Sequence, residues 1–157
     1  MIRPATVHDA DAVAAVLIES RRAFLPFAPL AHPEDDVRRW VREALIPNER
    51  VVVWAAEDQV VAMLAVSPPG QEAWIHQLYV RPGWTGRGIG ARLLAWAHVQ
   101  LAPAVHLWTF QANRGARRFY ERHGYAAVTF TNGQGNEERC PDVLYRLDPA
   151  GISKPRP

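Results

Sequence analysis

The segment YVRPGWTGRGIGARLLAWAH, residues 79–98, places three glycines within five positions, between an apolar stretch and apolar residues at helical spacing. Because glycine has no Cβ, its backbone adopts left-handed conformations and approaches ligands closely. A glycine-rich turn from a strand into a helix directs successive N–H groups into one concavity, where the helix N-terminus adds partial positive charge. The segment therefore predicts a strand, loop and helix that bind an anion, most often a phosphate.

Two common phosphate-binding loops do not fit this segment. It lacks the Gly-Lys-Ser/Thr sequence of a Walker loop, and its glycines do not follow the G-x-G-x-x-G spacing of a dinucleotide-binding fold. The acidic residue expected about 20 positions later in that fold is also missing, since Phe110 occupies the region. These residues alone leave one alternative open, a glycine-rich connection that binds nothing.

Apolar periodicity indicates a single α/β domain. The chain has 157 residues, of which 48% are hydrophobic, and this is enough for one core. Apolar runs predict strands and i, i+3, i+4, i+7 spacing predicts helices, in the order βααβββαβαββ, with helices on both faces of a mixed sheet. The domain spans residues 1–147, and the polar, proline-rich residues 148–157 predict a flexible tail. The expected strands are 1–5, 50–57, 60–66, 73–80, 105–110, 125–130 and 141–147, and the expected helices are 13–24, 33–47, 89–101 and 113–124.

Composition excludes several classes of protein. The formal net charge is only +2, and the arginines form no continuous stripe with interleaved aromatic residues, so we expect no nucleic-acid partner. No apolar run approaches the roughly 18 residues of a membrane span, and the N-terminus lacks a secretory apolar segment, which favours a cytoplasmic protein without membrane contact. The six histidines and the single cysteine, Cys140, show no metal-ligand spacing, so we expect no metal.

A second motif, NRGARRFYERHGY at residues 113–125, begins with a potential helix N-cap and ends with a glycine exit from the helix. With the glycine loop before it, this segment resembles the GNAT superfamily of acyl-CoA-dependent N-acetyltransferases. Their phosphate loop reads Gln/Arg-x-x-Gly-x-Gly/Ala, and their later motif runs Asn, Ala, Phe/Tyr-Tyr and Gly-Phe/Tyr. The matching residues are Thr85, Gly86, Arg87, Gly88, Ile89 and Gly90 in the first motif and Asn113, Ala116, Phe119, Tyr120, Gly124 and Tyr125 in the second.

The resemblance implies a fold and an activity. The sheet would be mostly antiparallel, with its fourth and fifth strands splayed apart. The protein would move an acetyl group from its cosubstrate acetyl-CoA to a primary amine of a small molecule or a peptide, as a monomer or homodimer. Because Cys140 has no evident activating partner, we expect direct attack in a ternary complex rather than an acyl-cysteine intermediate. The alternative function is a binding module that senses acyl-CoA without catalysis.

The resemblance also assigns cofactor contacts. The fourth strand would bulge and bond the pantetheine arm, and a backbone N–H near Leu78 would stabilise the oxyanion of the tetrahedral intermediate. Gly88 and Gly90 would be needed because a Cβ would meet the ligand or a positive φ. Thr85 departs from the family pattern, which removes a long side chain from the phosphates. The expected cofactor-binding residues are Leu78, Tyr79, Val80, Thr85, Gly86, Arg87, Gly88, Ile89, Gly90, Asn113 and Tyr120.

Proton transfer would involve two residues. Tyr120 stands at the family's position for the acid that protonates the departing thiolate, although its helical position also suits a core aromatic residue. His76 lies two positions before Leu78 and by strand alternation would share its face, as the base that deprotonates the amine. A structural histidine, with water as the proton carrier, is equally compatible with His76. Asn113 is also explained as an N-cap.

The acceptor amine would enter opposite the cofactor, between the first two helices and the loop that joins the last two strands. Two groups of residues in these segments are candidates for binding it. Arg21, Phe24 and Phe27, with Arg22 nearby, suit an acidic or aromatic acceptor. Glu137 and Glu138 suit an ammonium group, and solvated loop charges are the alternative explanation for both groups.

Overall fold

The computed structural model describes residues 1–149, and its order of elements confirms the expected βααβββαβαββ arrangement. The tail expected at 148–157 lies outside the described residues from position 150 onward. The strands are β1 (Ile2–Pro4), β2 (Arg50–Ala56), β3 (Gln59–Val66), β4 (Ala73–Val80), β5 (Val105–Phe110), β6 (Ala126–Phe130) and β7 (Asp142–Leu147). The helices are η1 (Val7–Asp9), α1 (Ala10–Phe24), α2 (Glu34–Trp40), η2 (Val41–Leu45), α3 (Ile46–Asn48), α4 (Ile89–Gln100) and α5 (Arg114–Arg122).

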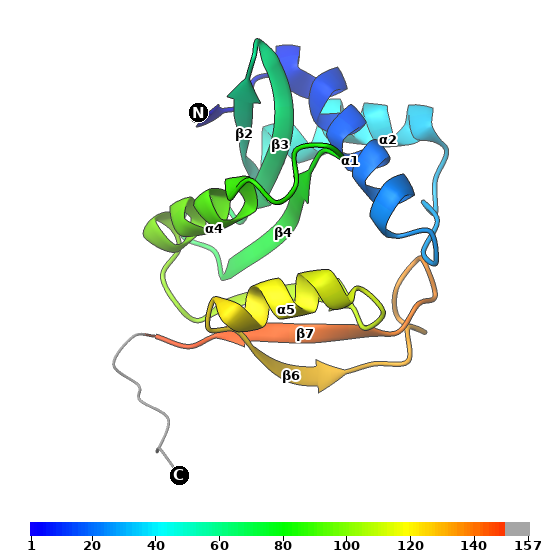
Figure 1. Ribbon diagram of the computed structural model, residues 1–157, viewed down its shortest axis with the longest axis vertical. Coiled ribbons are helices and arrows are strands. Elements are labelled where there is room, and N and C mark those ends of the chain that lie inside the picture. The colour runs from blue at the N-terminus through cyan, green and yellow to red at the C-terminus, as the bar shows by residue number, and fades with distance from the viewer. Residues whose placement is uncertain (150–157) are drawn as a thin grey trace.

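The strands form one sheet in the order β1-β2-β3-β4-β5-β7-β6. All neighbouring pairs are antiparallel except β4 and β5, which run parallel. These two strands pair only at Ala73 with Val105 and at Trp74 with His106. Beyond these residues no pairing joins them, and Figure 1 shows β4 slanting away from β7, the strand on the other side of β5. The splayed fourth and fifth strands expected from the sequence are therefore present.

Helices cover both faces of the sheet and enclose two hydrophobic cores. On one face, α4 and α5 pack against the sheet through fully buried residues such as Leu93 and Leu107. On the other face, α1 and α2 pack through residues such as Val13 and Met63. Because burying one such side chain stabilises the fold by about 1.5–3 kcal/mol, the two cores fix which elements flank the splayed strands.

The second expected helix is continuous but not uniform. The segments α2, η2 and α3 follow one another without a break, and η2 is a π-helical turn in which the N–H of Ile46 donates to the carbonyl of Val41. Val37, Val41 and Leu45 are buried along its inner face, whereas Trp40, which shares their helical spacing, is 41% exposed. Trp40 ends the regular α-helical segment, directly before the wider turn.

β4 contains one extra residue relative to β3. Val66 pairs with Ile75, and Ala65 pairs with Gln77, so His76 is the bulged residue. The bulge reverses the alternation of faces, because Ile75 and Leu78 both pack in the core beneath α4, whereas Tyr79 packs against the core beneath α1. The expectation that His76 and Leu78 share a face is therefore wrong, since it assumed an unbroken two-residue period.

Candidate active site

Three adjoining cavities run through the gap between β4 and β5. The glycine-loop cavity, of about 740 Å³, lies beside the glycine segment and α5. The central cavity, of about 100 Å³, lies between the diverging strands, and the outer cavity, of about 540 Å³, lies beneath the loop that joins β6 to β7. Tyr79 lines all three, so the cavities adjoin one another along β4, and we call the three together the passage.

The glycine-loop cavity is formed largely by backbone. Gly86 and Gly88 have φ values of +76° and +80°, which side-chain-bearing residues rarely adopt, and Gly88 is the N-cap of α4. Gly90 has no positive φ, and a Cβ there would lie 3.6 Å from the ring of Phe119, an ordinary contact. The backbone conformation of the chain therefore requires glycine at position 88, as expected, but contacts within the chain do not require it at position 90.

The Arg87 side chain does not line this cavity. Its guanidinium carbon lies 4.5 Å from the centre of the Trp84 ring, and Nη2 donates to the Gly83 carbonyl over 3.1 Å. Thr85, Gly86, Gly88, Ile89 and Gly90 do line the cavity, together with Val80 and Asn113. An anion in this concavity would therefore meet backbone N–H groups rather than the Arg87 guanidinium.

The central cavity has both polar and apolar walls, and Tyr120 lines it. Leu25, Leu78 and Tyr120 line both this cavity and the glycine-loop cavity, and the Tyr120 residue is 8% exposed. Burial raises the pKa of Tyr120 above its usual range, and nearby Tyr79 adds to the shift. The phenol is therefore neutral at physiological pH and available as a hydrogen-bond donor.

Asn113 starts α5 at the wall shared by the same two cavities. Its Oδ1 accepts a hydrogen bond from the backbone N–H of Ala116 over 3.2 Å, so the expected N-cap is confirmed. This cap fixes the start of α5 and with it the position of Tyr120, two helical turns further on.

His76 lies on the far side of β4 from Leu78 and lines the central and outer cavities. Its Nε2 is 3.6 Å from Oε2 of Glu49, and its ring stacks on Trp74 with 6.4 Å between centres. The His76 side chain is 38% exposed. The bulge therefore directs an accessible imidazole, with a carboxylate behind it, toward the outer cavity.

The outer cavity is closed by a loop, residues 131–141, that folds tightly upon itself. Gly133 has a φ of +85°, and a Cβ there would lie 2.4 Å from the carbonyl carbon of Cys140, so only glycine fits. Asn136 makes two hydrogen bonds to the backbone of Cys140, donating to its carbonyl over 2.7 Å and accepting from its N–H over 3.2 Å. These contacts form a preorganised wall for the cavity.

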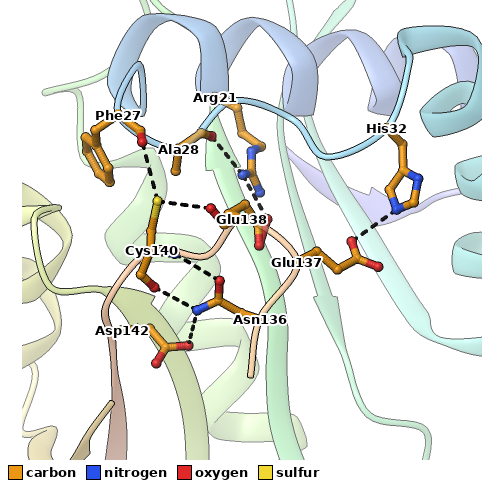
Figure 2. Close-up of polar contacts among 9 residues, drawn as sticks. All are labelled: Arg21, Phe27, Ala28, His32, Asn136, Glu137, Glu138, Cys140 and Asp142. Atoms are coloured by element: carbon orange, nitrogen blue, oxygen red, sulfur yellow. Dashed lines mark hydrogen bonds and ion pairs between the residues drawn. The ribbon is translucent and has the colours of Figure 1, made fainter. Parts of the chain in front are cut away.

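Side chains join this loop to the segment after α1, as Figure 2 shows. Arg21 Nη2 pairs with Glu138 over 3.1 Å and also donates to the Ala28 carbonyl over 3.2 Å. The Cys140 thiol donates to the Phe27 carbonyl over 3.4 Å. The loop and the end of α1 therefore form one wall of the outer cavity, although they are far apart in the sequence.

The structure separates the expected acceptor residues. Arg21 and Glu138 line the outer cavity, already paired with each other. Glu137 is outside the cavity lining, 68% exposed, and bonded to His32 over 3.1 Å. Phe24 lines the glycine-loop cavity instead.

Two further candidates do not line the outer cavity. The Phe27 ring packs edge-to-face against Phe110, with 6.0 Å between centres. Arg22 is exposed and pairs with Glu34. Of these two, only Phe27 supports a residue of the cavity wall.

Several residues of the outer cavity were not singled out from the sequence. Trp108 and Phe110 lie on one face of β5, Asp142 starts β7, and Gln77 follows the bulge. Isolated aromatic and acidic residues in strands carry no local signal of a site, because strands are brought together by pairing between distant segments. Only the expected position of the last loop opposite the cofactor pointed to this region.

Two expected absences can be compared with the described residues. Among residues 1–149, no group of three or more histidine, cysteine or carboxylate side chains is placed to hold a metal ion. Within the same part of the chain, none of the helices combines the length and apolar character that crossing a bilayer requires.

Comparison with known proteins agrees with this architecture. Aminoalkylphosphonate N-acetyltransferase of Salmonella typhimurium is 29% identical over 139 residues, which span 82% of this chain and 86% of that protein. Among solved structures, apo YjaB of Escherichia coli superposes with a TM-score of 0.74 at 20% identity, covering 94% of this chain and 96% of that one. The PaiA N-acetyltransferase of Thermoplasma acidophilum, solved with coenzyme A, gives 0.70 at 17% identity, covering 94% and 98%.

At such identities the structural likeness establishes the fold. The family model for the acetyltransferase (GNAT) family matches residues 15–125, a stretch that runs from α1 through α5 to Tyr125. It includes the glycine loop, the splayed strands and the Asn113-to-Tyr125 motif. The chain therefore belongs to the GNAT acetyltransferase family.

Proposed function

We propose that the protein transfers an acetyl group from acetyl-CoA to a primary amine by direct attack in a ternary complex. The observation that carries this proposal is the passage of three adjoining cavities between β4 and β5. It has a backbone-lined concavity at one end and a polar cavity at the other. Two ligands entering from opposite ends would meet at the central cavity.

The donor would occupy the glycine-loop cavity. Its pyrophosphate would bind the backbone from Thr85 to Gly90, which includes Gly86, Arg87, Gly88 and Ile89, and the partial positive charge at the start of α4 favours an anion there. The pantetheine arm would lie along β4 at Leu78, Tyr79 and Val80, whose edge toward β5 is free of strand pairing. The Val80 carbonyl is already bonded by Ser20 Oγ over 2.9 Å, so other backbone groups would hold the arm.

The reaction would take place at the central cavity. The amine nitrogen attacks the thioester carbon, and the carbonyl oxygen becomes an oxyanion that the Leu78 N–H stabilises. When the C–S bond breaks, the thiolate takes a proton from the Tyr120 phenol, which solvent then restores. Because burial raises the pKa of Tyr120 from an ordinary value already well above 7, the phenol is protonated at neutral pH before the transfer.

The amine must lose a proton to attack and to leave a neutral amide. His76, which lines the central and outer cavities, would accept it directly or through water. Glu49, 3.6 Å from Nε2, would stabilise the imidazolium that forms. The acceptor side of the site would include Arg21, Phe27 and Glu138.

Amine-dependent release of free thiol from acetyl-CoA tests this function. We expect no thiol release without an acceptor and saturable release with at least one member of a panel of primary amines. The acetylated amine should appear in the same amount as the thiol by mass spectrometry. Acetyl-CoA binding by calorimetry without release for any amine, amino acid or peptide would instead identify a binding module.

A further inference from the structure

The outer cavity has an excess of negative charge. Among the described residues that line it, Arg21 is the only arginine or lysine, whereas Glu138 and Asp142 are both carboxylates. Arg21 and Glu138 neutralise each other at 3.1 Å, and the Arg21 guanidinium is further occupied by the Ala28 carbonyl and the Phe110 ring. Asp142 is therefore the carboxylate whose charge is not compensated.

Asp142 is held in place by neutral donors. One carboxylate oxygen accepts from the Thr131 hydroxyl, and the other accepts from Asn136 Nδ2 over 3.1 Å. A carboxylate offers about four acceptor positions, so two remain for a ligand. Because the Thr131 and Asn136 bonds fix its orientation, Asp142 is preorganised to bind a cation without first breaking an ion pair.

Asp142 lies too far from β4 to bind the nitrogen that attacks the thioester. It starts β7, and β5 lies between β7 and β4 in the sheet. Neighbouring strands are about 4.8 Å apart, so at least about 10 Å separates β4 from β7, and the splay of β4 increases this. A cation at Asp142 must therefore be a second group of the acceptor.

The wall between these two positions is aromatic. Phe110 pairs in register with Asp142, and Trp108, two residues earlier on the same face of β5, is 46% exposed. Aromatic faces accommodate methylene chains and attract cations. They therefore suit an apolar spacer between two amino groups.

We propose that the acceptor is a diamine or another amine with a second cationic group, which Asp142 binds while the neutral amino group attacks the thioester. This rests on the proposed acetyl transfer and specifies its acceptor. An acceptor with a negative distal group, such as the aminoalkylphosphonates in the name of the Salmonella relative, would place like charge beside Asp142. The cavity therefore selects against such acceptors.

Matched acceptors test this proposal in the wild-type protein. Diaminoalkanes of four to six carbons are compared with monoaminoalkanes and ω-amino acids of the same lengths. We expect the best diamine to exceed its monoamine in kcat/KM by about tenfold to a hundredfold, as for one charge-assisted hydrogen bond, with the amino acid poorest. Equal values for diamine and monoamine, or preference for the amino acid, would overturn the proposal without touching acetyl transfer itself.

Two variants test whether Asp142 causes the preference for diamines. Asp142→Asn removes the charge, and the Thr131 hydroxyl can accept from the new amide, so we expect the diamine preference to vanish while monoamine turnover persists. Glu137→Gln makes the same charge change in the loop that precedes Asp142, outside the cavity lining, and should retain the preference. Retention of the preference in Asp142→Asn would refute the role of Asp142. Absence of thiol release with every amine, despite calorimetric acetyl-CoA binding, would refute acetyl transfer instead.

Discussion

The two ends of the passage are built in different ways. The glycine-loop cavity owes its shape to a short contiguous segment whose backbone conformation is set by Gly86 and Gly88 and by the start of α4. The outer cavity takes side chains from α1, β4, β5, β7 and the loop between β6 and β7. A site made of local backbone tolerates changes elsewhere in the chain. A site made of distant side chains depends on each tie between them.

The largest effect is expected from a change that disrupts the glycine-loop cavity. Gly88→Val places a β-branched residue at φ +80°, which costs about 1–2 kcal/mol and displaces the N–H groups that face the anion. We expect at least about a hundredfold loss of acetyl-CoA affinity by calorimetry, which corresponds to about 2.7 kcal/mol. Gly70→Val carries the same backbone strain at φ +84°, outside the three cavities, and should bind normally. Equal losses in both variants would mean that strain alone is responsible.

The second largest effect is expected at the central cavity, between the glycine-loop cavity and the outer cavity. Tyr120→Phe should lower kcat by about a hundredfold to ten-thousandfold, in the range of general acid catalysis, and leave acetyl-CoA affinity unchanged. Tyr125→Phe is the matched control, because Tyr125 is also buried but does not line the cavities. Its hydroxyl is hydrogen-bonded to Nε2 of His98, with 2.8 Å between the two atoms. Steady-state kinetics on both variants measures this. An unchanged kcat for Tyr120→Phe would leave Tyr120 as a packing residue.

A smaller effect is expected from a change that disrupts the outer cavity alone. Arg21→Met leaves Glu138 partly buried without its partner, so we expect unfolding free energy to fall by about 2 kcal/mol and the acceptor KM to rise about tenfold. Acetyl-CoA affinity should not change. Arg22→Met, at the neighbouring exposed position, should alter neither quantity. Urea unfolding and initial rates measure both, and an equal loss of acetyl-CoA affinity would show that the two ends are coupled.

The smallest effect is expected from a change outside both cavities, and it concerns the free energy of unfolding of the whole domain. The Arg3 guanidinium lowers the pKa of Asp9 from its ordinary 3.8 to about 2. The pair therefore stabilises the fold fully above about pH 4, and its contribution is lost as pH falls through about 2. After allowance for the exposure of Arg3, Asp9→Asn should cost about 1 kcal/mol at pH 7 and progressively less toward pH 2 in urea titrations. A constant difference across this range would exclude the ion pair as its cause.

The same contrast explains what could be predicted from the sequence. Strand and helix order follows from local apolar periodicity, and the glycine loop is a contiguous pattern, so the order of elements and the place of this loop between β4 and α4 were predicted correctly. The pairing of Arg21 with Glu138 joins residues 117 positions apart, and no local pattern encodes it. The resemblance implied a bulge in the fourth strand, but no local pattern gives its position at His76, because register depends on hydrogen bonding to β3. The proposed role of Asp142 could not be predicted either, because it depends on Arg21 being paired with Glu138 and therefore not with Asp142.

The extra residue in β4 is accommodated without changing which side of the sheet the later residues face. Ile75 and Leu78 are three positions apart, and they share the face toward α4 because His76 stands outside the two pairing frames. Deleting His76 would place Ile75 and Leu78 two positions apart, so regular alternation alone would keep Leu78 facing α4 and Tyr79 facing α1. Only the bulge and its imidazole would be lost from the cavity walls. A single inserted position thus adds a titratable side chain to β4 while the residues on either side of it keep their places.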